Sequence, residues 1–239
     1  MPTNPPKSHD SGEEIRRIKR VFADREASAV VRAQLDSGNA GNARIVHEQR
    51  SRLEQLVKRG RRPLGRARVL DVGCGSGLVL GWLQELGVPA QNLFGIDLLP
   101  NRIEAARERF PRFTFAVANA EDLSFPDGSF DLVLVFTVFS SILDLEVAEN
   151  VAESIRRVLQ SDGAVVWYDI RYPNPRNADV RAMTKPRIRS LFPGLALDLE
   201  PITVIPPVAR RLGPLTGSAY PALAALPLLR SHYLGLLQR

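Results

Sequence analysis

Short apolar runs alternate with segments of helical spacing through the middle of the chain. Near-continuous apolar strands separated by helices are typical of a parallel sheet that is buried on both faces. The pattern therefore predicts an α/β fold with a doubly wound sheet, whose ligands bind beyond the carboxyl ends of the strands. Strands are expected at Arg68–Val72, Leu93–Asp97, Phe113–Val117, Phe130–Phe136 and Ala164–Ile170, and helices at Leu78–Leu86, Pro100–Phe110 and Val147–Leu159.

The two ends of the chain depart from this alternation. Residues 1–12 contain three prolines and are expected to form a disordered lead. Residues 13–65 are expected to form a helical cap, with helices at 13–35 and 42–59, ahead of a domain over 66–239 with its core at 67–172. The remaining elements are expected to be a helix at Asp179–Phe192, a strand at Ala196–Ile205 interrupted at Pro201, and a strand at Ser231–Gln238.

Composition restricts the class of protein. The chain is 44% hydrophobic and 24% charged, which is ordinary for a globular domain. No apolar stretch reaches the roughly 18 residues that span a bilayer, and the polar start of the chain has no secretory signal, so we expect a cytoplasmic protein. The single cysteine, Cys74, cannot form an internal disulfide, and three scattered histidines predict no metal site.

The positive charge is concentrated in the N-terminal part. Residues 1–68 hold 16 Lys and Arg against 8 Asp and Glu, a balance of +8, and the rest holds 16 against 18, a balance of −2. A basic region of this kind attracts nucleic acid, an anionic membrane or an anionic small molecule. A solvated helix face is the simpler explanation of this charge.

A glycine-rich turn follows the first predicted strand. Asp71 precedes Gly73, Cys74, Gly75 and Gly77, so three glycines stand at alternate positions before the helix. Such glycines let the backbone turn tightly and let a ligand approach the main chain. A dinucleotide turn has its third glycine one residue later, and a carboxylate beside the turn suits an ammonium group better than a pyrophosphate.

The next two strands also end in polar residues. Asp97 ends the second strand and Leu98 follows it, and a carboxylate at this place can accept hydrogen bonds from both hydroxyls of a ribose. Asn119 and Ala120 follow the third strand. An acid at the end of the second strand is shared with NAD-binding folds and does not discriminate between ligands by itself.

These features, taken in order, resemble the motifs of class I S-adenosylmethionine (SAM) dependent methyltransferases of the type 11 group. The resemblance implies SAM as the cofactor and a Rossmann-like, seven-stranded, mostly parallel sheet, whose last strand is antiparallel and inserts between the fifth and sixth. It also implies that Asn119, where the family more often has Asp, accepts a hydrogen bond from the adenine amino group, and that the Ala120 N–H meets a ring nitrogen. The side chain of Cys74 is expected to pack within the turn. Those of Phe136 and Phe139 are expected either to wall the sulfonium or to pack in the core.

The residues that would bind the methyl acceptor are less clearly indicated by the sequence. Related small-molecule enzymes carry one or two histidines where Ser140 and Ser141 stand, so an obvious base is absent. We expect Asp169, at the end of the fifth strand, to serve as the acid–base residue, unless it forms a structural pair with Arg171. His47 is the alternative, because its predicted helix often folds over the cofactor site in the family that the chain resembles. Substrate-binding residues are expected at Ser140, Tyr168, Arg171, Tyr172 and Arg176.

The function predicted from the sequence is methyl transfer by in-line displacement to a small molecule. A sugar, a glycan or a secondary metabolite is the expected acceptor, and oxygen is the expected acceptor atom. An anionic sugar nucleotide would suit a site on which Arg44, Arg50, Arg171 and Arg176 converge. Two alternatives stay open. The pI near 10 is compatible with an RNA methyltransferase, although no motif for nucleic acid stands out, and the missing histidines allow a non-catalytic SAM-binding scaffold.

One leucine-rich stretch, Leu223–Leu237, is not explained by any of these functions. We interpret it as a core or dimer-forming segment, so a homodimer is allowed. The richness in leucine also allows a membrane-surface role, but Pro227, Arg230 and His232 interrupt the stretch and favour the first interpretation.

Overall fold

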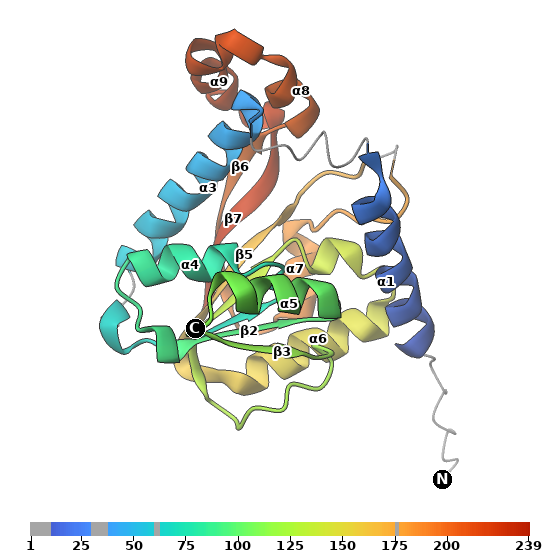
Figure 1. The fold of residues 1–239 in the computed structure, drawn as a ribbon, viewed down its shortest axis with the longest axis vertical. Coiled ribbons are helices and arrows are strands. Elements are labelled where there is room, and N and C mark those ends of the chain that lie inside the picture. Colours follow the sequence, from blue (N-terminus) through green and yellow to red (C-terminus); the bar gives the residue numbers. More distant parts are fainter. Residues whose placement is uncertain (1–10, 30–37, 60–62, 175–176) are drawn as a thin grey trace.

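The computed structural model describes residues 11–29, 38–59, 63–174 and 177–239 (Figure 1). Its centre is a seven-stranded sheet with strand order β3-β2-β1-β4-β5-β7-β6. The strands are β1 Val69–Val72, β2 Leu93–Asp97, β3 Thr114–Val117, β4 Phe130–Phe136, β5 Leu159–Ile170, β6 Ala196–Val204 and β7 Arg230–Gln238. The predicted doubly wound, Rossmann-like sheet is therefore confirmed.

The last strand has the predicted direction and place. β1 to β5 pair in parallel, whereas β7 runs antiparallel to both β5 and β6 and lies between them. The register pairs Tyr168 with Leu234 and Ile170 with His232. The beginning of β7 thus lies beside the carboxyl end of β5.

Helices cover both faces of the sheet because each strand alternates its side chains between the two faces. Val133 and Val135 of β4 pack into the core under α6 and α7, whereas Leu132 and Leu134 face the core under α3, α4 and α5. The helix bounds are α3 Ala40–Lys58, α4 Leu78–Glu85, α5 Pro100–Arg109, α6 Leu145–Val158 and α7 Lys185–Leu191. Between β6 and β7 come α8 Pro206–Arg211 and α9 Thr216–Ala224, with the short helices η4 Gly213–Leu215 and η5 Pro227–Leu229.

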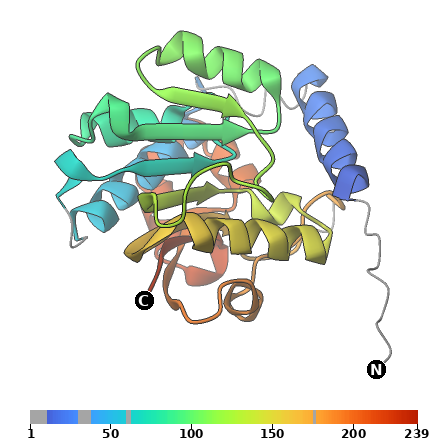
Figure 2. The same cartoon turned by 90° about the horizontal axis from the view of Figure 1, so that it is seen from below.

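The N-terminal helix lies at the carboxyl edge of the sheet. α1 spans Ser11–Ala27, and the arrowheads of the parallel strands point toward it (Figure 2). α3 lies elsewhere and packs on α4, β6, β7, α8 and α9. The two N-terminal helices therefore contact different parts of the molecule, and the predicted domain boundary at residue 65 stays a prediction.

Three predictions need correction, and two predicted segments cannot be fully assessed. α1 begins at Ser11, inside the predicted lead, and residues 1–10 and 30–35 lie outside the described residues. The predicted helix at 179–192 is only α7, because the N–H groups of Arg181 and Met183 bond to the carbonyls of Ser140 and Ile170 instead of forming a helix. β6 runs through Pro201 without interruption, which an edge strand permits since a proline there needs no partner for an N–H.

No helix among the described residues is both long and apolar enough to cross a membrane.

Candidate active site

A hollow of about 790 Å³ lies beyond the carboxyl ends of β1, β2 and β4. α1 covers it, and Ile15, Ile18 and Phe22 of that helix contribute side chains to its wall. Six predicted cofactor-binding residues meet there, because parallel strands end at one edge of the sheet. These six residues are Gly73, Asp97, Leu98, Asn119, Ala120 and Phe136.

The glycine turn has the backbone shape that its composition requires. Gly73, Gly75 and Gly77 all have positive φ, at 72°, 52° and 76°. A Cβ on Gly73 would lie 2.9 Å from Cγ2 of Val138, which itself lines the hollow. The N–H groups of Gly73 and Cys74 both donate to the Ile96 carbonyl, at 2.8 and 2.9 Å, so the turn is fixed to the end of β2.

Cys74 is a buried part of this turn. Its thiol lies 3.6 Å from the Gly75 carbonyl oxygen, and burial raises the pKa of the thiol well above its usual value. A thiol that stays protonated is a poor nucleophile. The structure therefore favours the predicted packing role for Cys74.

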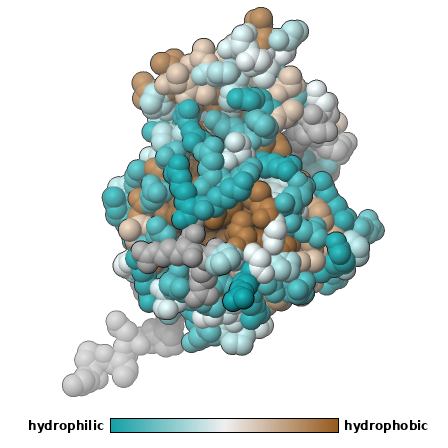
Figure 3. Space-filling model, turned by 90° about the vertical axis from the view of Figure 1, so that its left-hand side faces the viewer, coloured by the Kyte–Doolittle hydropathy of each residue, from teal (hydrophilic) through white to brown (hydrophobic). Residues whose placement is uncertain are grey.

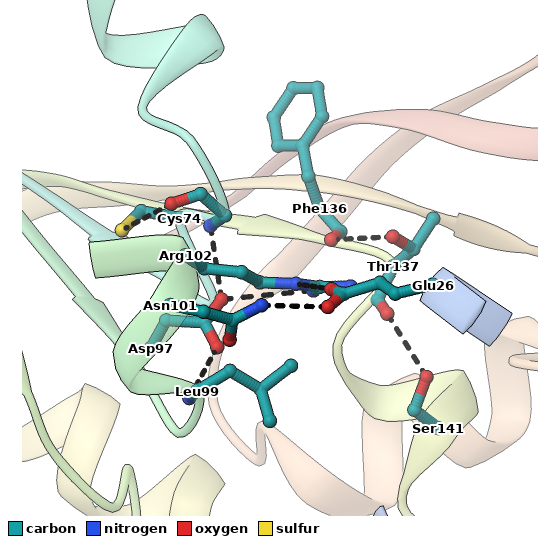
Figure 4. Close-up of polar contacts among 10 residues, drawn as sticks. Glu26, Cys74, Asp97, Leu99, Asn101, Arg102, Phe136, Thr137 and Ser141 are labelled. Atoms are coloured by element: carbon teal, nitrogen blue, oxygen red, sulfur yellow. Dashed lines mark hydrogen bonds and ion pairs between the residues drawn. The ribbon is translucent and has the colours of Figure 1, made fainter. Parts of the chain in front are cut away.

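Asp97 organises the rim of the hollow (Figure 4). One carboxylate oxygen accepts from the Gly75 N–H and the other from the Leu99 N–H, each at 3.0 Å. The Arg102 guanidinium lies 3.9 Å from the first of these oxygens. Two carboxylate oxygens offer about four acceptor positions, so Asp97 keeps capacity for the two hydroxyls of a ribose.

Asp71 is fully buried beneath the turn and does not line the hollow directly. Burial, and after it the negative charge of Asp97, raise the pKa of Asp71 well above its usual value. Its Oδ1 atom has no hydrogen-bond partner among the described residues. An unpaired buried acceptor invites a donor, and an ammonium group reached directly or through water fits that need.

Asn119 and Ala120 lie where β3 continues into the loop above the hollow. Oδ1 of Asn119 accepts from the Glu121 N–H at 3.1 Å, and its Nδ2 donates to the Glu121 carboxylate at 3.0 Å. These bonds fix the orientation of the amide. One lone pair of Oδ1 remains for an amino group, as the resemblance implies.

Thr137 is a residue that the sequence reasoning missed. It follows β4, lines the hollow, and has a φ of 56°, which is strained for a β-branched residue. Its N–H donates to the Tyr168 carbonyl at 2.7 Å and its hydroxyl to the Phe136 carbonyl at 2.7 Å. Strain of this kind concentrates at functional sites, but it depends on the fold and leaves no mark in the sequence.

Polar contacts at both ends of α1 hold it over the hollow. Near its start, Glu14 accepts from the Leu143 N–H at 2.6 Å, and Arg17 donates to the Ser141 carbonyl. Burial would raise the pKa of Glu14, but the hydrogen bonds from Arg17 and from the Leu143 N–H outweigh it, and the pKa is lowered. The carboxylate is therefore charged over the physiological range.

The far end of α1 is bound to α5 (Figure 4). The Glu26 carboxylate accepts from Asn101 at 2.7 Å and from Arg102 at 2.8 Å. The Arg102 guanidinium also lies 4.5 Å from the centre of the Phe22 ring. Spacings of three and four among the apolar residues of α1 indicated a buried face, but the sequence did not show that this face covers the site.

Asp169 does not reach the hollow. Its side chain is 1% exposed, and its two oxygens accept from the N–H groups of Ser140 and Ile170 at 2.9 and 2.8 Å. Burial raises its pKa to about 6. This geometry suits a residue that holds the turn after β4 better than one that takes a proton from an acceptor.

The remaining predicted acceptor residues lie away from the hollow. Ser140 is buried under the same turn, whereas Ser141 lines the hollow. Tyr168 is buried between the rings of Phe136 and His232, at centroid distances of 5.3 and 4.7 Å. Its hydroxyl pairs with Thr203 at 3.1 Å.

The predicted arginines and His47 do not converge on the hollow either. Arg171 donates to the Pro227 carbonyl and stacks on Tyr172, so both residues lie beside η5. Arg176 lies outside the described residues. His47 lies on α3 and lines a different hollow, between α3 and α9. The expectation that the helix of His47 folds over the cofactor site is wrong, because α1 occupies that position and α3 packs on β6 and β7.

The described residues contain no cluster of three His, Cys, Asp or Glu side chains that could hold a metal ion. Asp97 and Arg102 are the only charged side chains among the described residues that line the main hollow. Its other walls are apolar or carry hydroxyl and amide groups. The arrangement can bind a nucleoside-like ligand and a small apolar molecule, and it can position them with little water.

Comparison with known proteins agrees with this geometry. Residues 70–167 match the family model described as a methyltransferase domain. A 2-methyl-6-phytyl-1,4-hydroquinone methyltransferase of Synechocystis is 35% identical over 128 residues, which are 52% of this chain and 38% of that protein. A ribosomal protein L11 methyltransferase of Burkholderia cenocepacia is 36% identical over 104 residues, covering 44% of this chain and 31% of that protein.

The alignments thus span half or less of the curated relatives. Among solved structures, a SAM-dependent methyltransferase from Mesorhizobium loti superimposes with a TM-score of 0.56 at 20% identity, over 74% of this chain and 92% of that one. At this identity the likeness shows the fold. The two curated relatives carry names with very different acceptors, a quinol and a ribosomal protein.

Proposed function

Because residues 70–167 form a class I SAM-dependent methyltransferase domain, for which SAM is the cofactor, we propose that the chain methylates a small molecule. The observation that carries this proposal is the hollow of about 790 Å³ beneath α1, with Asp97 at its rim and apolar walls beyond.

The residues present fit the cofactor at three points. Asp97 would hold the ribose hydroxyls, Asn119 and Ala120 would face the adenine, and the turn above Asp71 would receive the charged amino-acid end. When bound, SAM supplies a methyl group that is attached to a positively charged sulfur. The leaving group is the neutral thioether that contains this sulfur. The unpaired Oδ1 of Asp71 and the spare acceptor positions of Asp97 are the structural observations behind this fit.

The protein itself contributes to the reaction by positioning the acceptor. An in-line displacement needs the acceptor atom held at about 3 Å from the carbon that it attacks. Ile15 and Ile18 of α1 and Phe136 and Val138 after β4 line the hollow and restrict both water and the acceptor. Thr137 offers an exposed hydroxyl beside them.

The described lining includes no histidine, lysine or glutamate, and Asp169 is buried away from it. A sugar hydroxyl with a high pKa gains from a base, whereas an acidic hydroxyl or an electron-rich carbon needs less help. We therefore favour a secondary metabolite of phenol or hydroquinone type over a sugar. Oxygen as the acceptor atom stays our expectation, and carbon is the alternative that the name of the hydroquinone relative suggests.

The test is methyl transfer from labelled SAM to a panel of phenols, hydroquinones and sugars. We expect turnover with a phenol or hydroquinone, with the label in the extracted product. Turnover with sugars alone would contradict the proposed acceptor class. A folded protein that binds SAM but methylates no member of a broad panel, RNA included, would favour the non-catalytic scaffold.

A further inference from the structure

The segment between β6 and β7 forms a protrusion that the active site does not use. We call residues 206–229 the tip: α8, η4, α9 and η5 stand together at the end of the molecule beyond the sheet, next to the beginning of α3 (Figure 1). α3 contacts both α8 and α9. A small separate core, with Val204, Ala209 and Tyr220 fully or almost fully buried, holds the tip together.

Large apolar side chains of the tip face solvent. Leu228 is 80% exposed, Leu215 64% and Leu226 53%. Apolar side chains reach the surface at the top of Figure 3, at the end of the molecule where Figure 1 draws α8 and α9. Single exposed leucines are ordinary on a protein surface, but three in one short excursion indicate contact with an apolar partner.

The charge around these leucines has one sign. Residues 206–230 contain three arginines and no aspartate or glutamate. Arg211 of α8 is exposed, and Arg230 follows η5 directly. The tip is therefore both apolar and basic, although residues 69–239 as a whole carry more acidic than basic groups.

A second hollow, of about 650 Å³, adjoins the tip between α3 and α9. Arg44, His47, Arg52 and Arg230 line it, and the Nε atom of Arg44 has no hydrogen-bond partner among the described residues. The acid in its lining, Glu48, already accepts from the Tyr220 hydroxyl at 2.7 Å and the Thr203 N–H at 3.0 Å.

Arg52 has an acidic neighbour as well, Glu200, at 3.9 Å. Arg44 instead lies 5.6 Å from the centre of the Tyr220 ring, and it forms no ion pair within the described part of the chain. The basic groups of this hollow are thus only partly neutralised.

We propose that the tip and this basic hollow dock the protein on a lipid surface that contains anionic lipids. The leucines would enter the boundary between headgroups and acyl chains, and the arginines would meet the lipid phosphates. A second copy of the chain would present another basic surface and repel the first. RNA would satisfy the arginines but leave the leucines in water.

The tip lies at the edge of the sheet that also carries the active site. Ile170 at the end of β5 pairs with His232 at the beginning of β7, two residues after Arg230. Docking through the tip would turn the carboxyl edge of the sheet toward the lipid. This docking does not depend on the proposed methyl transfer, and a failure of either proposal leaves the other testable.

The experiment is flotation of the full chain with phosphatidylcholine vesicles, with and without phosphatidylglycerol. We expect flotation only with the anionic vesicles and its loss in high salt. Leu226→Ser should weaken binding severalfold, and the Leu215→Ser/Leu226→Ser/Leu228→Ser variant at least about tenfold. Arg44→Gln with Arg211→Gln should also weaken binding, without changing the exposed apolar surface.

A matched control separates the tip from general stickiness. Leu145, at the start of α6, is exposed to the same 53% as Leu226, so Leu145→Ser removes an equal apolar surface elsewhere. Equal losses in the two variants, or no flotation with anionic vesicles, would overturn the proposal. A stable dimer that the leucine variants dissociate, in a protein that does not float, would show a self-interface instead. If the triple variant does not fold by circular dichroism, the comparison of the two single variants decides.

Discussion

At one half of the sheet edge, beyond β1 to β4, the glycine turn, Asp97 and Asn119 stand within a few residues of a strand end, and α1 supplies the cover. At the other half, beyond β5, β7 and β6, the groups that meet come from α3, β6, α9 and β7, up to 172 residues apart in the case of Glu48 and Tyr220. The first half contains the glycine turn and Asp97. The second contains the tip and the basic hollow.

This contrast shows which parts of a site can be predicted from residues that are neighbours in the sequence. A turn that follows a strand is set by consecutive residues, so its ligand can be inferred from glycine spacing and one acid. A surface assembled from distant segments carries no such motif. We therefore expect substitutions in the first half to change SAM affinity and substitutions in the second half to leave it unchanged.

The largest effect is expected from Gly73→Ala. A left-handed backbone costs an L residue about 1–2 kcal/mol, and the contact of the new Cβ with Val138 adds about 1–3 kcal/mol. Relief of this strain would move residues that line the hollow. We expect the SAM dissociation constant to rise at least about thirtyfold, measured by calorimetry.

Gly194→Ala is the control for this glycine. Gly194 has a φ of +83°, and a Cβ there meets nothing within 4 Å. The variant should lose about 1–2 kcal/mol of unfolding free energy and keep its SAM affinity. An equal loss of affinity in both variants would show that backbone strain anywhere, rather than the turn, controls binding.

The second prediction concerns Asp169 and pH. Its pKa is raised to about 6 by burial, above its usual value of 3.8, so the folded state holds its proton more tightly than the unfolded state. The stability that it contributes is therefore complete below about pH 4 and is lost as pH rises through 6. The loss amounts to about 3 kcal/mol.

Asp169→Asn removes this titration. We expect the difference in unfolding free energy between the wild type and the variant to change in favour of the variant from pH 4 to pH 7, as measured by urea denaturation. A difference that is constant with pH would refute the buried, titrating carboxyl. The SAM affinity of the variant at neutral pH tells whether the turn after β4 is also disturbed.

A smaller effect is expected at the covering helix. Phe22→Ala removes a ring that lines the hollow and packs against Arg102. We expect about a tenfold loss of SAM affinity, because a half-buried aromatic contributes on the order of 1–2 kcal/mol at such a contact. Val46→Ala, on the exposed surface of α3, should change nothing, and a similar loss there would mean that α1 has no special place over the site.

The smallest effect is expected for His47→Ala. His47 lies on α3, in the hollow beside the tip, and it does not line the hollow around Asp97. SAM affinity should stay within about twofold of the wild type, which is ordinary for a surface substitution. A large loss of SAM affinity would show that the hollow beside the tip takes part in cofactor binding, and would contradict the separation of the two halves of the edge.

Much of the fold followed from the sequence. The apolar runs located β1, β2 and β4 within a residue, since a buried parallel strand must be apolar throughout. The strand through Pro201 was misjudged because the proline was taken as a break, although the implied strand order already placed this strand at the edge, where a proline is tolerated. The shortened α7 was misjudged because bonds from Arg181 and Met183 to distant carbonyls replaced helical ones.

The site divides in the same way. Six predicted cofactor residues reach the hollow because they are local to strand ends. Asp169 was expected to act on an acceptor, yet it is buried by the turn that it holds, and polarity at a strand end cannot distinguish these roles. The cover by α1 and the strained Thr137 depend on contacts between distant segments, and no pattern in the chain encodes them.

The decisive experiment is calorimetric titration of the full chain with SAM, for the wild type and for Asp97→Ala. The control is Asp131→Ala, which removes another buried carboxylate that accepts a backbone N–H, that of Arg68, at the start of β4. We expect binding by the wild type and the Asp131 variant and at least about a thirtyfold loss for the Asp97 variant. A folded wild type that binds no SAM, or an equal loss in both variants, would contradict the assignment of the hollow as the cofactor site.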